Sequence, residues 1–490
     1  MIFAVLIVSF CGLLVLWSKL KPRGPSPPVH PGALPILGHA HQLYGDPKKF
    51  WVTKKKMYQF SLDSGGVSEI RLGPHSVYVL TDPDDSLVIA NTCLNKPYYY
   101  DFAKEMFNRG LVTASLTTWK PHRKLLYPAF NMQVLATFVT EYNTQSRNLV
   151  AALKAEVGKE PFNVRQYLVN QLLKTVCQTS LGLETKDKSI DEDYANATED
   201  LFMLFIERLK KIYLHLPFIF AWSSIKAKQD QLLKITNEAM FRVIDKRKVE
   251  LKGSVVKNKT PTRDVKFKPL LDQLLELSDT QDALSDAEIR EHLDTVVAAA
   301  YDTTATAITY ALILLGTYPE IQDRAYKEIK TVLGDEDKDI SKDDLQKLVY
   351  IEAVLKESMR MYPSVPCVAR SIETDVQLKN YTLPAGSSCM ISIYGMNHHA
   401  MWGADVDEFK PERWLDPSTL PDNPNVFCSF SLGKRNCLGR LYAMLVMKTM
   451  LAHILRKFLI ISDINSITTQ YDILIKPADN SQIRLELRSE

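Results

Sequence analysis

The sequence predicts a large, mainly α-helical fold with a minor β portion, and three observations support this prediction. Helical periodicity covers most of the chain between residues 119 and 361, and it returns after residue 437. One helical pattern, from about Ser285 to Gly316, is too long and too apolar for a surface helix, so we expect it to cross the core. Strand-like segments are short and lie mainly within residues 66–90 and 376–394.

The composition is that of a globular protein with enough material for a large core. The chain has 490 residues, of which 46% are hydrophobic and 24% are charged. Its formal charge of +3 is too near neutral to indicate nucleic acid as the main partner. The seven cysteines are scattered and form no Cys-x-x-Cys pair, which argues against a disulfide framework and against a structural zinc site.

The amino terminus is predicted to anchor the chain in a membrane. Ile2 to Trp17 is almost wholly apolar, and Lys19, Lys21 and Arg23 follow at once. Because positive charge after an apolar run favours the cytosolic side, we prefer a signal anchor to a cleaved signal peptide. We therefore predict an anchor over residues 1–20, with the body of the protein facing the cytosol.

A proline-rich hinge is predicted over residues 21–36, and residues 37–490 are predicted to form the main domain. The hinge is either a rigid connector or a plain linker. Ser285 and Glu288 form a capping-box pattern that starts the long helix. The other expected elements are a hairpin across Gly73 and Pro74, helices over residues 119–181, 195–208 and 225–251, a basic loop over 252–268, helices over 319–333 and 345–361, strands over 376–383 and 388–394, and a last helix from after Cys437 to Leu455.

The strongest chemical signal is the segment from Phe430 to Gly439, in which Cys437 lies at a turn before a helix. Amides at a helix amino terminus stabilise an anion, so the pKa of this thiol is expected to be lowered and the thiolate to bind a metal. Gly433 and Gly439 allow close approach to a flat cofactor, and Arg435 can pair with a carboxylate on it. A structural buried cysteine is the plainer alternative, which the five-position pattern disfavours.

This segment resembles the haem-binding signature of the cytochrome P450 family at all five positions: Phe430, Gly433, Arg435, Cys437 and Gly439. The resemblance implies the cytochrome P450 fold, with a long central helix over the haem and a proximal cysteine loop. It implies haem b (iron-protoporphyrin IX), with Cys437 as the sulfur ligand that favours cleavage of the oxygen–oxygen bond of O2. Residues 37–490 are then the haem-binding catalytic domain, and the insect microsomal and fatty-acid-hydroxylase branch is the most similar.

Asp302 and Thr303, in the middle of the long helix, resemble the oxygen-activation site of that family. The resemblance implies two catalytic residues: the threonine hydroxyl assists O2 activation, and the acid relays protons from solvent. A helix distortion satisfied by the backbone is the alternative. The family often has glycine where this chain has Ala300, whose methyl group narrows the oxygen groove. Ala299 replaces a glutamate that often binds haem covalently, so we predict noncovalent haem apart from the thiolate.

Glu357 and Arg360 lie three residues apart on a predicted helix, where they can form an ion pair. Alone, this spacing is usually a solvated surface pair. It resembles the family's Glu-x-x-Arg motif, and Arg413 resembles the arginine that joins that pair. We assign these three residues a structural role in folding, because a buried charge network is strongly destabilised when one member is lost.

Trp119 and Arg123 share one face of a predicted helix and resemble a family motif that contacts a haem propionate. Arg370 matches another propionate-binding arginine, and Arg435 lies in the cysteine segment. Arginine suits this task because it pairs with a carboxylate in bidentate geometry. Core and surface packing are the plainer interpretations of Trp119 and Arg370.

The chain has no Gly-x-Gly-x-x-Gly or Gly-x-x-x-x-Gly-Lys fingerprint, so it is predicted to receive electrons from NADPH indirectly. The resemblance implies a membrane-bound NADPH-dependent flavin reductase, with cytochrome b5 as a second candidate partner. Basic residues around the haem motifs are either a docking face for an acidic partner or ordinary solvated charge. These residues are Lys120, Lys124, Lys434, Arg440 and Lys448.

The expected substrate is a lipophilic small molecule, because two segments that line the pocket in this family are apolar or aromatic here. Each residue has core packing as its alternative. They are Tyr98, Tyr99, Tyr100, Phe102, Met106 and Phe107, and Val365, Pro366, Cys367 and Val368.

The predicted function is a microsomal monooxygenase of the endoplasmic reticulum membrane, which inserts one atom of O2 into a fatty acid, hormone, pheromone or xenobiotic. Two alternatives stay open. The first is a haem-thiolate isomerase or dehydratase that acts on hydroperoxides without a reductase. The second is a non-catalytic haem-binding sensor.

Overall fold

The computed structural model describes residues 25–184, 187, 189–256, 268–281, 284–478 and 482–488, together with residues 9 and 12. The predicted anchor over residues 1–20 and most of the predicted basic loop therefore lie outside the described residues. The six cysteines within them, from Cys93 to Cys437, are all free.

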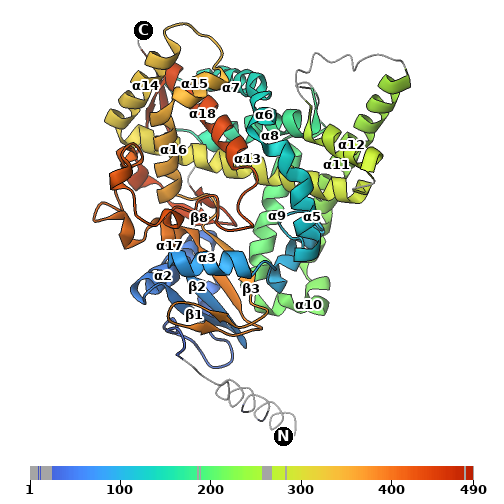
Figure 1. Ribbon diagram of the computed structural model, residues 1–490, viewed down its shortest axis with the longest axis vertical. Helices are drawn as coiled ribbons and strands as arrows, with labels where there is room; N and C mark the ends of the chain where they lie inside the picture. The colour runs from blue at the N-terminus through green and yellow to red at the C-terminus, as the bar shows by residue number, and fades with distance from the viewer. Residues whose placement is uncertain are drawn as a thin grey trace.

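The structure is mainly helical with a minor β portion, as predicted (Figure 1). The α-helices are α2 (Pro47–Asp63), α3 (Pro83–Thr92), α4 (Lys104–Phe107), α5 (Leu116–Leu126), α6 (Met132–Ala136), α7 (Val139–Leu153), α8 (Val164–Val176), α9 (Glu192–Lys210), α10 (Pro217–Ala221), α11 (Ser224–Val256), α12 (Leu270–Gln281), α13 (Asp286–Thr317), α14 (Pro319–Leu333), α15 (Lys342–Lys347), α16 (Val349–Met361), α17 (Ile393–Asn397) and α18 (Arg440–Lys457). The strands are β1 (Val67–Leu72), β2 (His75–Leu80), β3 (Cys367–Ser371), β4 (Val376–Gln377), β5 (Thr382–Leu383), β6 (Ser388–Ser392), β7 (Phe458–Ile461), β8 (Thr469–Tyr471), β9 (Ile475–Pro477) and β10 (Arg484–Leu487).

Short turns complete the element order. Most are 3-10 turns, and η5 is a π-helical turn. They are η1 (Ala40–Leu43), η2 (Tyr98–Ala103), η3 (Tyr127–Phe130), η4 (Lys154–Glu156), η5 (Cys177–Leu181), η6 (Ile212–His215), η7 (Ala400–Trp402), η8 (Pro411–Trp414), η9 (Pro417–Thr419), η10 (Pro424–Val426) and η11 (Ile464–Ser466).

The largest sheet has the strand order β1-β2-β6-β3 and lies at the lower end of the molecule in Figure 1. Its first two strands form the predicted antiparallel hairpin, with Val67 opposite Leu80. Strand β6 is parallel to β2 and antiparallel to β3. The sheet therefore joins the amino-terminal hairpin to segments that lie about 300 positions later in the chain.

Three predicted elements are corrected by the structure. The expected strand over residues 376–383 is a hairpin of β4 and β5, because the chain turns back where the Leu378 amide donates to the Tyr381 carbonyl. Residues 393–394 belong to α17, because the Ser392 hydroxyl caps that helix by accepting from the Gly395 amide. The expected helix over residues 345–361 begins anew at Val349, where the Glu328 carboxylate accepts from the Tyr350 and Ile351 amides.

Helix α13 crosses the core as predicted, and its amino terminus carries the predicted capping box. The Ser285 amide donates to Glu288 Oε2 at 2.9 Å, and the Glu288 amide donates to Ser285 Oγ at 3.3 Å. It is the one helix of the described residues that is long and apolar enough to cross a membrane. However, 78% of its apolar stretch is buried inside the protein. Burial of this kind identifies a core helix.

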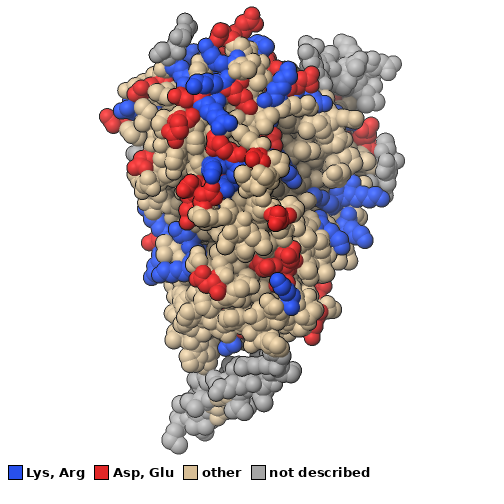
Figure 2. Space-filling model, turned by 60° about the vertical axis from the view of Figure 1, so that its left-hand side comes forward, with Lys and Arg blue, Asp and Glu red and all other residues tan. Residues whose placement is uncertain are grey.

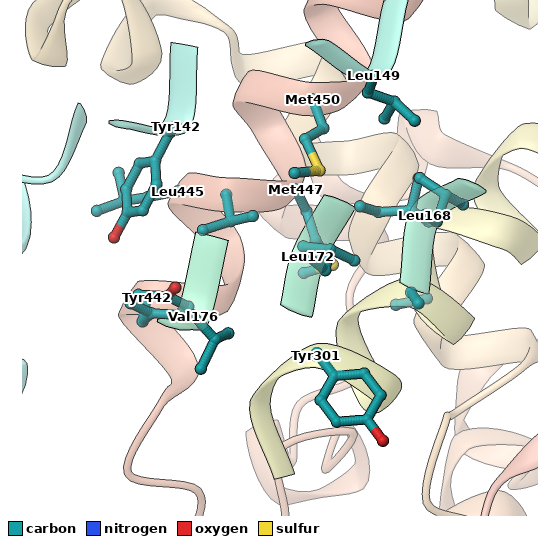
Figure 3. Close-up of a cluster of buried hydrophobic side chains, with 14 of the residues drawn as sticks. Tyr142, Leu149, Leu168, Leu172, Val176, Tyr301, Tyr442, Leu445, Met447 and Met450 are labelled. Carbon is teal, nitrogen blue, oxygen red and sulfur yellow. The ribbon is translucent and has the colours of Figure 1, made fainter. Parts of the chain in front are cut away.

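The main core is formed where α7, α8, α13 and α18 meet (Figure 3). Tyr142 and Tyr442 meet edge to face, with ring centroids 5.6 Å apart. Tyr301 of α13 and Leu172 of α8 belong to the same buried cluster. Because α18 begins three residues after Cys437, this core fixes the position of the cysteine loop against the central helix.

Candidate functional site

The loop before α18 is held in a conformation that requires glycine at one position. The Cys437 amide donates to the Phe430 carbonyl at 2.9 Å, and the Asn436 amide donates to the Gly433 carbonyl at 3.2 Å. Gly433 has φ +68°, and a Cβ atom there would lie 2.7 Å from Cβ of Ala90. A side chain at residue 433 would therefore clash with α3 as well as strain the backbone.

The Cys437 thiol lies at the end of the cysteine loop, just before α18. Its side chain is accessible, yet protein surrounds the sulfur closely enough for burial to raise the pKa of the thiol. The Gly439 amide, Arg123 and Arg440 oppose this rise only in part. The prediction that the pKa of this thiol is lowered is therefore wrong when only protein groups surround the sulfur. A bound metal ion, which deprotonates a coordinating thiol outright, would make the thiolate.

One stripe of α13 borders an accessible space, although the rest of its middle is buried. From Leu293 to Leu315 the accessible residues recur at helical spacing, so they share one face; they are Val296, Ala299, Ala300 and Thr303. The Thr303 hydroxyl donates to the Ala299 carbonyl at 2.8 Å. The predicted oxygen-activation threonine therefore lies on the open face of the helix.

Asp302 lies outside this stripe and is fully buried. Its carboxylate pairs with Arg165 and lies 3.1 Å from Nζ of Lys476. Burial would raise the pKa of Asp302, but Lys476 and Arg165 together hold it below its ordinary value. No sequence motif indicated either cation, because both are distant from Asp302 in the chain. The predicted acid and alcohol are thus adjacent in sequence, while their side chains have different partners.

Three cations gather beside the cysteine loop without an acidic partner among the described residues. Arg435 donates to the Ala114 carbonyl at 2.9 Å, while its Nε and one terminal nitrogen are buried with no partner. Arg370 likewise has a buried Nε with no partner. Burial, and then Arg370, lower the pKa of Arg435 to about 10. Burial also lowers the pKa of Lys96, with Arg370 and Arg435 adding to the effect.

Unpaired buried cations are costly, so this cluster is suited to an anionic ligand. Its positive charge would suit the two carboxylates of a haem beside Cys437. Trp119 packs on the cluster, since its ring centroid lies 4.6 Å from the guanidinium carbon of Arg435. Arg123 instead donates to the Asn436 carbonyl at 2.9 Å and to its side-chain oxygen at 3.0 Å, which braces the cysteine loop. Sequence reasoning missed Lys96, which has no motif around it.

Glu357, Arg360 and Arg413 meet in the interior, where all three are almost inaccessible. Arg360 binds both Glu357 oxygens, at 2.9 and 3.0 Å, and Arg413 Nε donates to Glu357 Oε1 at 2.8 Å. The Trp414 indole donates to Glu357 Oε2 at 2.9 Å, a partner that the sequence did not reveal. The carboxylate is thereby fully hydrogen-bonded.

This network reaches the cysteine loop through Asn397. Arg360 donates to the Asn397 carbonyl at 3.0 Å, and the Asn397 side chain donates to Ser429 Oγ at 2.9 Å. Ser429 in turn donates to the Met359 carbonyl at 2.9 Å. The helix that carries Glu357 therefore holds the start of the loop that carries Cys437.

The residues predicted to line a pocket lie in different environments. Tyr98 is exposed, and its hydroxyl is hydrogen-bonded to Nδ1 of His215 at 3.0 Å. Burial raises the pKa of both Tyr99 and Tyr100, so these two face the interior. Phe107 joins a small apolar cluster with Phe202 and Ala298, and Met106 packs against it. Val368 and Cys367 belong to β3, which the sequence did not predict as a strand.

The predicted basic face is only partly realised. Lys120, Lys124, Lys434 and Arg440 are exposed. Lys448 is buried and bound to Glu352 at 3.0 Å, so its inclusion in the face is wrong. A surface pocket of about 180 Å³ adjoins Arg440, and its apolar lining includes Phe430, Leu441 and Met444.

Comparison with known proteins gives one family. The sequence model described as Cytochrome P450 matches residues 27–483. The chain is 32% identical over 378 residues to cytochrome P450 4c21 of Blattella germanica, which covers 76% of this chain and 75% of that protein. It is 30% identical over 502 aligned positions to cytochrome P450 4V2 of Mus musculus, with 99% and 94% covered. It is 29% identical over 474 residues to cytochrome P450 4c3 of Drosophila melanogaster, with 94% and 89% covered.

Replacement of Glu357 by Gln should destabilise the protein, because two buried arginines lose their anionic partner. We expect a loss of about 3–5 kcal/mol in the free energy of unfolding, seen as a lower melting temperature. Glu486→Gln is the matched control, since that carboxylate forms an exposed ion pair with Arg484 and should change stability by less than about 1 kcal/mol. Equal melting temperatures for the two variants would contradict the structural role.

Replacement of Arg435 by Met should weaken the retention of haem, because it removes the best-placed cation for a carboxylate. We expect haem to transfer to excess apomyoglobin at least about tenfold faster, as for loss of one charge-assisted hydrogen bond. The neighbouring exposed Lys434→Met variant should transfer haem at the wild-type rate. Unchanged transfer from Arg435→Met would show that the cation cluster serves another ligand.

Proposed function

The chain belongs to the cytochrome P450 family and is a haem-thiolate monooxygenase, and we propose that it oxidises a lipophilic small molecule with electrons from NADPH through a separate flavin reductase. One observation carries the assignment of the site. The Cys437 thiol is accessible, and beside its loop lie three cations without an acidic partner among the described residues; together they would suit a flat dianionic cofactor with a metal at its centre.

Cys437 would hold the haem iron, and Lys96, Arg370 and Arg435 would hold its carboxylates. When bound, haem supplies the iron centre at which O2 is reduced and its bond is broken. Gly439 leaves room beside the sulfur, since a Cβ atom there would lie 4.0 Å from Cys437 Sγ. Ala299 lies on the open stripe of α13 and has no carboxylate, which supports noncovalent attachment of the haem apart from the thiolate.

Thr303 is the proposed site of proton delivery to the reacting oxygen. Its hydroxyl lies on the open stripe and donates to the Ala299 carbonyl, so rotation about one bond would redirect this proton into the space beside the helix. Asp302 would resupply the hydroxyl with protons from solvent. The two residues would thus act in sequence as an acid and an alcohol.

The proposed substrate is apolar because the side chains beside the open stripe are apolar. Phe107 and Phe202 lie with ring centroids 6.2 Å apart, and they pack with Ala298 of α13. Met106 and Ile473 pack against this cluster. Such a lining favours a fatty acid, hormone, pheromone or xenobiotic over a charged metabolite.

The reductase is proposed to dock on the exposed basic residues near the cysteine loop. Lys120 and Lys124 belong to α5, Lys434 to the loop before α18, and Arg440 is the first residue of α18. These segments adjoin the proposed haem site. The surface pocket beside Arg440 offers apolar contact within this basic face. An acidic flavin reductase would match both features, and cytochrome b5 is a second candidate.

We also propose that the protein lies on the endoplasmic reticulum membrane, with an anchor over residues 1–20 and the hinge over 21–36. Support comes from exposed apolar residues in two segments, α10 and the first part of the described chain. Phe218 is 66% exposed and Trp222 is 92% exposed, both around α10, and Leu34, Ile36 and Leu37 are also exposed. Figure 1 shows α10 and the β1–β2 hairpin at the same lower end, where the face in Figure 2 carries few charged side chains.

In phospholipid vesicles, Trp222 of the full chain should contact the lipid interface, because tryptophan favours that region. Brominated lipids should quench part of the tryptophan fluorescence of the wild type, and Trp222→Phe should lose that part. Trp51→Phe removes a buried indole and should leave the quenched part unchanged. Equal quenching in wild type and Trp222→Phe would contradict membrane contact by α10.

The haem-thiolate assignment is tested by Cys437→Ser. We expect loss of the red-shifted absorption of the reduced carbon-monoxide complex and loss of NADPH-dependent product formation with reductase, because the sulfur ligand is gone. Cys177→Ala, which removes another buried thiol, should retain both. Intact absorption in Cys437→Ser would overturn the assignment, and hydroperoxide turnover that needs no reductase would indicate the isomerase instead.

A further inference from the structure

Asp302 belongs to a buried cluster of five charged side chains from separate parts of the fold. Nζ of Lys476 is its centre, at 3.1 Å from Asp302, 3.2 Å from Asp472 and 3.0 Å from Glu199. Arg165 of α8 binds Asp302 and lies 3.4 Å from Glu199 of α9. The cluster therefore contains two cations and three carboxylates. Glu199 is its link to solvent, with a side chain that is 34% exposed, whereas Asp302 and Lys476 are 2% exposed.

As the structure stands, Asp302 is held as an anion. Arg165 binds one carboxylate oxygen and Lys476 lies against the other. Although burial favours the protonated form, these two cations hold the pKa of Asp302 below its ordinary value. A carboxylate in this state has no proton to pass to Thr303. Delivery of a proton therefore requires one of the two cations to move.

Lys476 is the cation on the more adaptable element. It lies in β9 of a hairpin whose turn runs from Asp472 to Leu474, whereas Arg165 lies in the helix α8. Ile473, at the tip of the turn, has φ +105°. A β-branched residue rarely adopts this conformation, so the turn is strained.

The same tip faces the proposed substrate pocket. From Tyr471 to Pro477, Ile473 is the residue whose side chain is not fully buried. It packs against the apolar cluster of Phe107, Phe202 and Ala298. The hairpin thus connects the apolar cluster, at Ile473, to the charged cluster, at the adjacent Asp472 and at Lys476 three residues on.

A second connection joins this hairpin to Thr303. The Ile475 amide donates to the Ser364 carbonyl at 2.9 Å, and the Ser364 hydroxyl donates to the Thr303 carbonyl at 2.9 Å. The hairpin therefore contacts Asp302 through the Lys476 side chain, and it is linked to the backbone of Thr303 through Ser364. Movement of the β8–β9 hairpin would therefore change the surroundings of both Asp302 and Thr303.

We propose that the β8–β9 hairpin couples occupancy of the pocket to proton delivery: a lipophilic molecule pressing on Ile473 moves Lys476 away from Asp302 and frees the carboxylate. Lys476 is then a positioning residue and Ile473 a substrate contact. This inference rests on the proposed monooxygenase function and adds to it a control of the Asp302–Thr303 pair. Without an occupant, the pair stays locked and little O2 is consumed.

The proton balance follows from the charges of the cluster. When Lys476 withdraws, Asp302 is left near Glu199 and Asp472 with Arg165 as its remaining cation, and like charges favour protonation. Asp302 then takes a proton from water at the exposed edge of Glu199. It gives this proton to Thr303 Oγ1 as the Thr303 O–H bond releases its own proton to the reacting oxygen. Asp302 returns to the anion, and one solvent proton has been consumed.

The movement is tested in the holoprotein by amide hydrogen exchange, with the Ile475 amide as reporter. The probes are 1-dodecylimidazole, whose ring binds the iron while its tail fills the pocket, and imidazole, which lacks the tail. We expect the tailed probe to speed exchange at Ile475 by about fivefold or more over imidazole, a typical coupling between sites. In Ile473→Ala the two probes should give equal exchange. Equal exchange in the wild type would overturn the proposal.

The lock is tested by the double variant Asp472→Asn/Lys476→Met, which removes one cation and one carboxylate and so keeps the formal charge of the cluster. With reductase, NADPH and no substrate, we expect O2 consumption to rise about fivefold or more over the wild type. The solvent isotope effect on this O2 consumption should also fall. A Lys476→Arg variant, which keeps a cation at residue 476, should retain the wild-type rate. Arg247→Met/Asp272→Asn removes a buried ion pair between α11 and α12 and should leave the rate unchanged.

An unchanged rate in Asp472→Asn/Lys476→Met, with the carbon-monoxide absorption intact, would overturn the role of Lys476. Failure of the proposed function has a different signature: the double variant and the wild type would then both consume no O2 with reductase and NADPH, and neither would show the carbon-monoxide absorption. The exchange experiment needs no turnover, so it judges the hairpin in either case.

Discussion

Burial of charge is the constraint on which this structure depends, because a charged group inside a protein must be paired or bind a ligand. The protein meets it in three ways. Glu357 is enclosed by two arginines and an indole, and every partner is at hydrogen-bonding distance. Arg435 and Arg370 keep buried nitrogens with no protein partner. Around Asp302, carboxylates outnumber cations. We propose that the three arrangements serve as a scaffold, a cofactor site and a switch.

The central helix α13 connects these arrangements. Its middle is buried on all sides except the stripe that carries Ala299 and Thr303. The core around Tyr142 and Tyr442 fixes α18, and thereby the loop with Cys437, against the same helix. Rigid packing on one side and an open stripe on the other are what a helix beside a cofactor needs. The buried anion at Asp302 lies off the stripe, where a hairpin and two helices can reach it.

Features with a local signal were predictable from the sequence. The capping box at Ser285 and the spacing of Glu357 and Arg360 lie within one helical turn, and the structure has both contacts. Features that depend on distant pairing were not predictable: Lys96 joins Arg370 only through the fold, and Lys448 is buried because Glu352 faces it. The pKa of Cys437 was predicted in the wrong direction, since its helix amides were visible in the sequence and its burial was not.

The contrast between Glu357 and Asp302 explains why the same chemistry serves two purposes. Each carboxylate lies between two cations away from solvent. The partners of Glu357 are held by α16 and by the short turn η8, and Arg360 is tied further to the Asn397 carbonyl. One partner of Asp302 instead belongs to a hairpin with a strained residue at its tip and a solvent-exposed carboxylate beside it. A fully enclosed pair resists every displacement, whereas a pair with one adaptable partner has a second state, and only such a pair can respond to what enters the pocket.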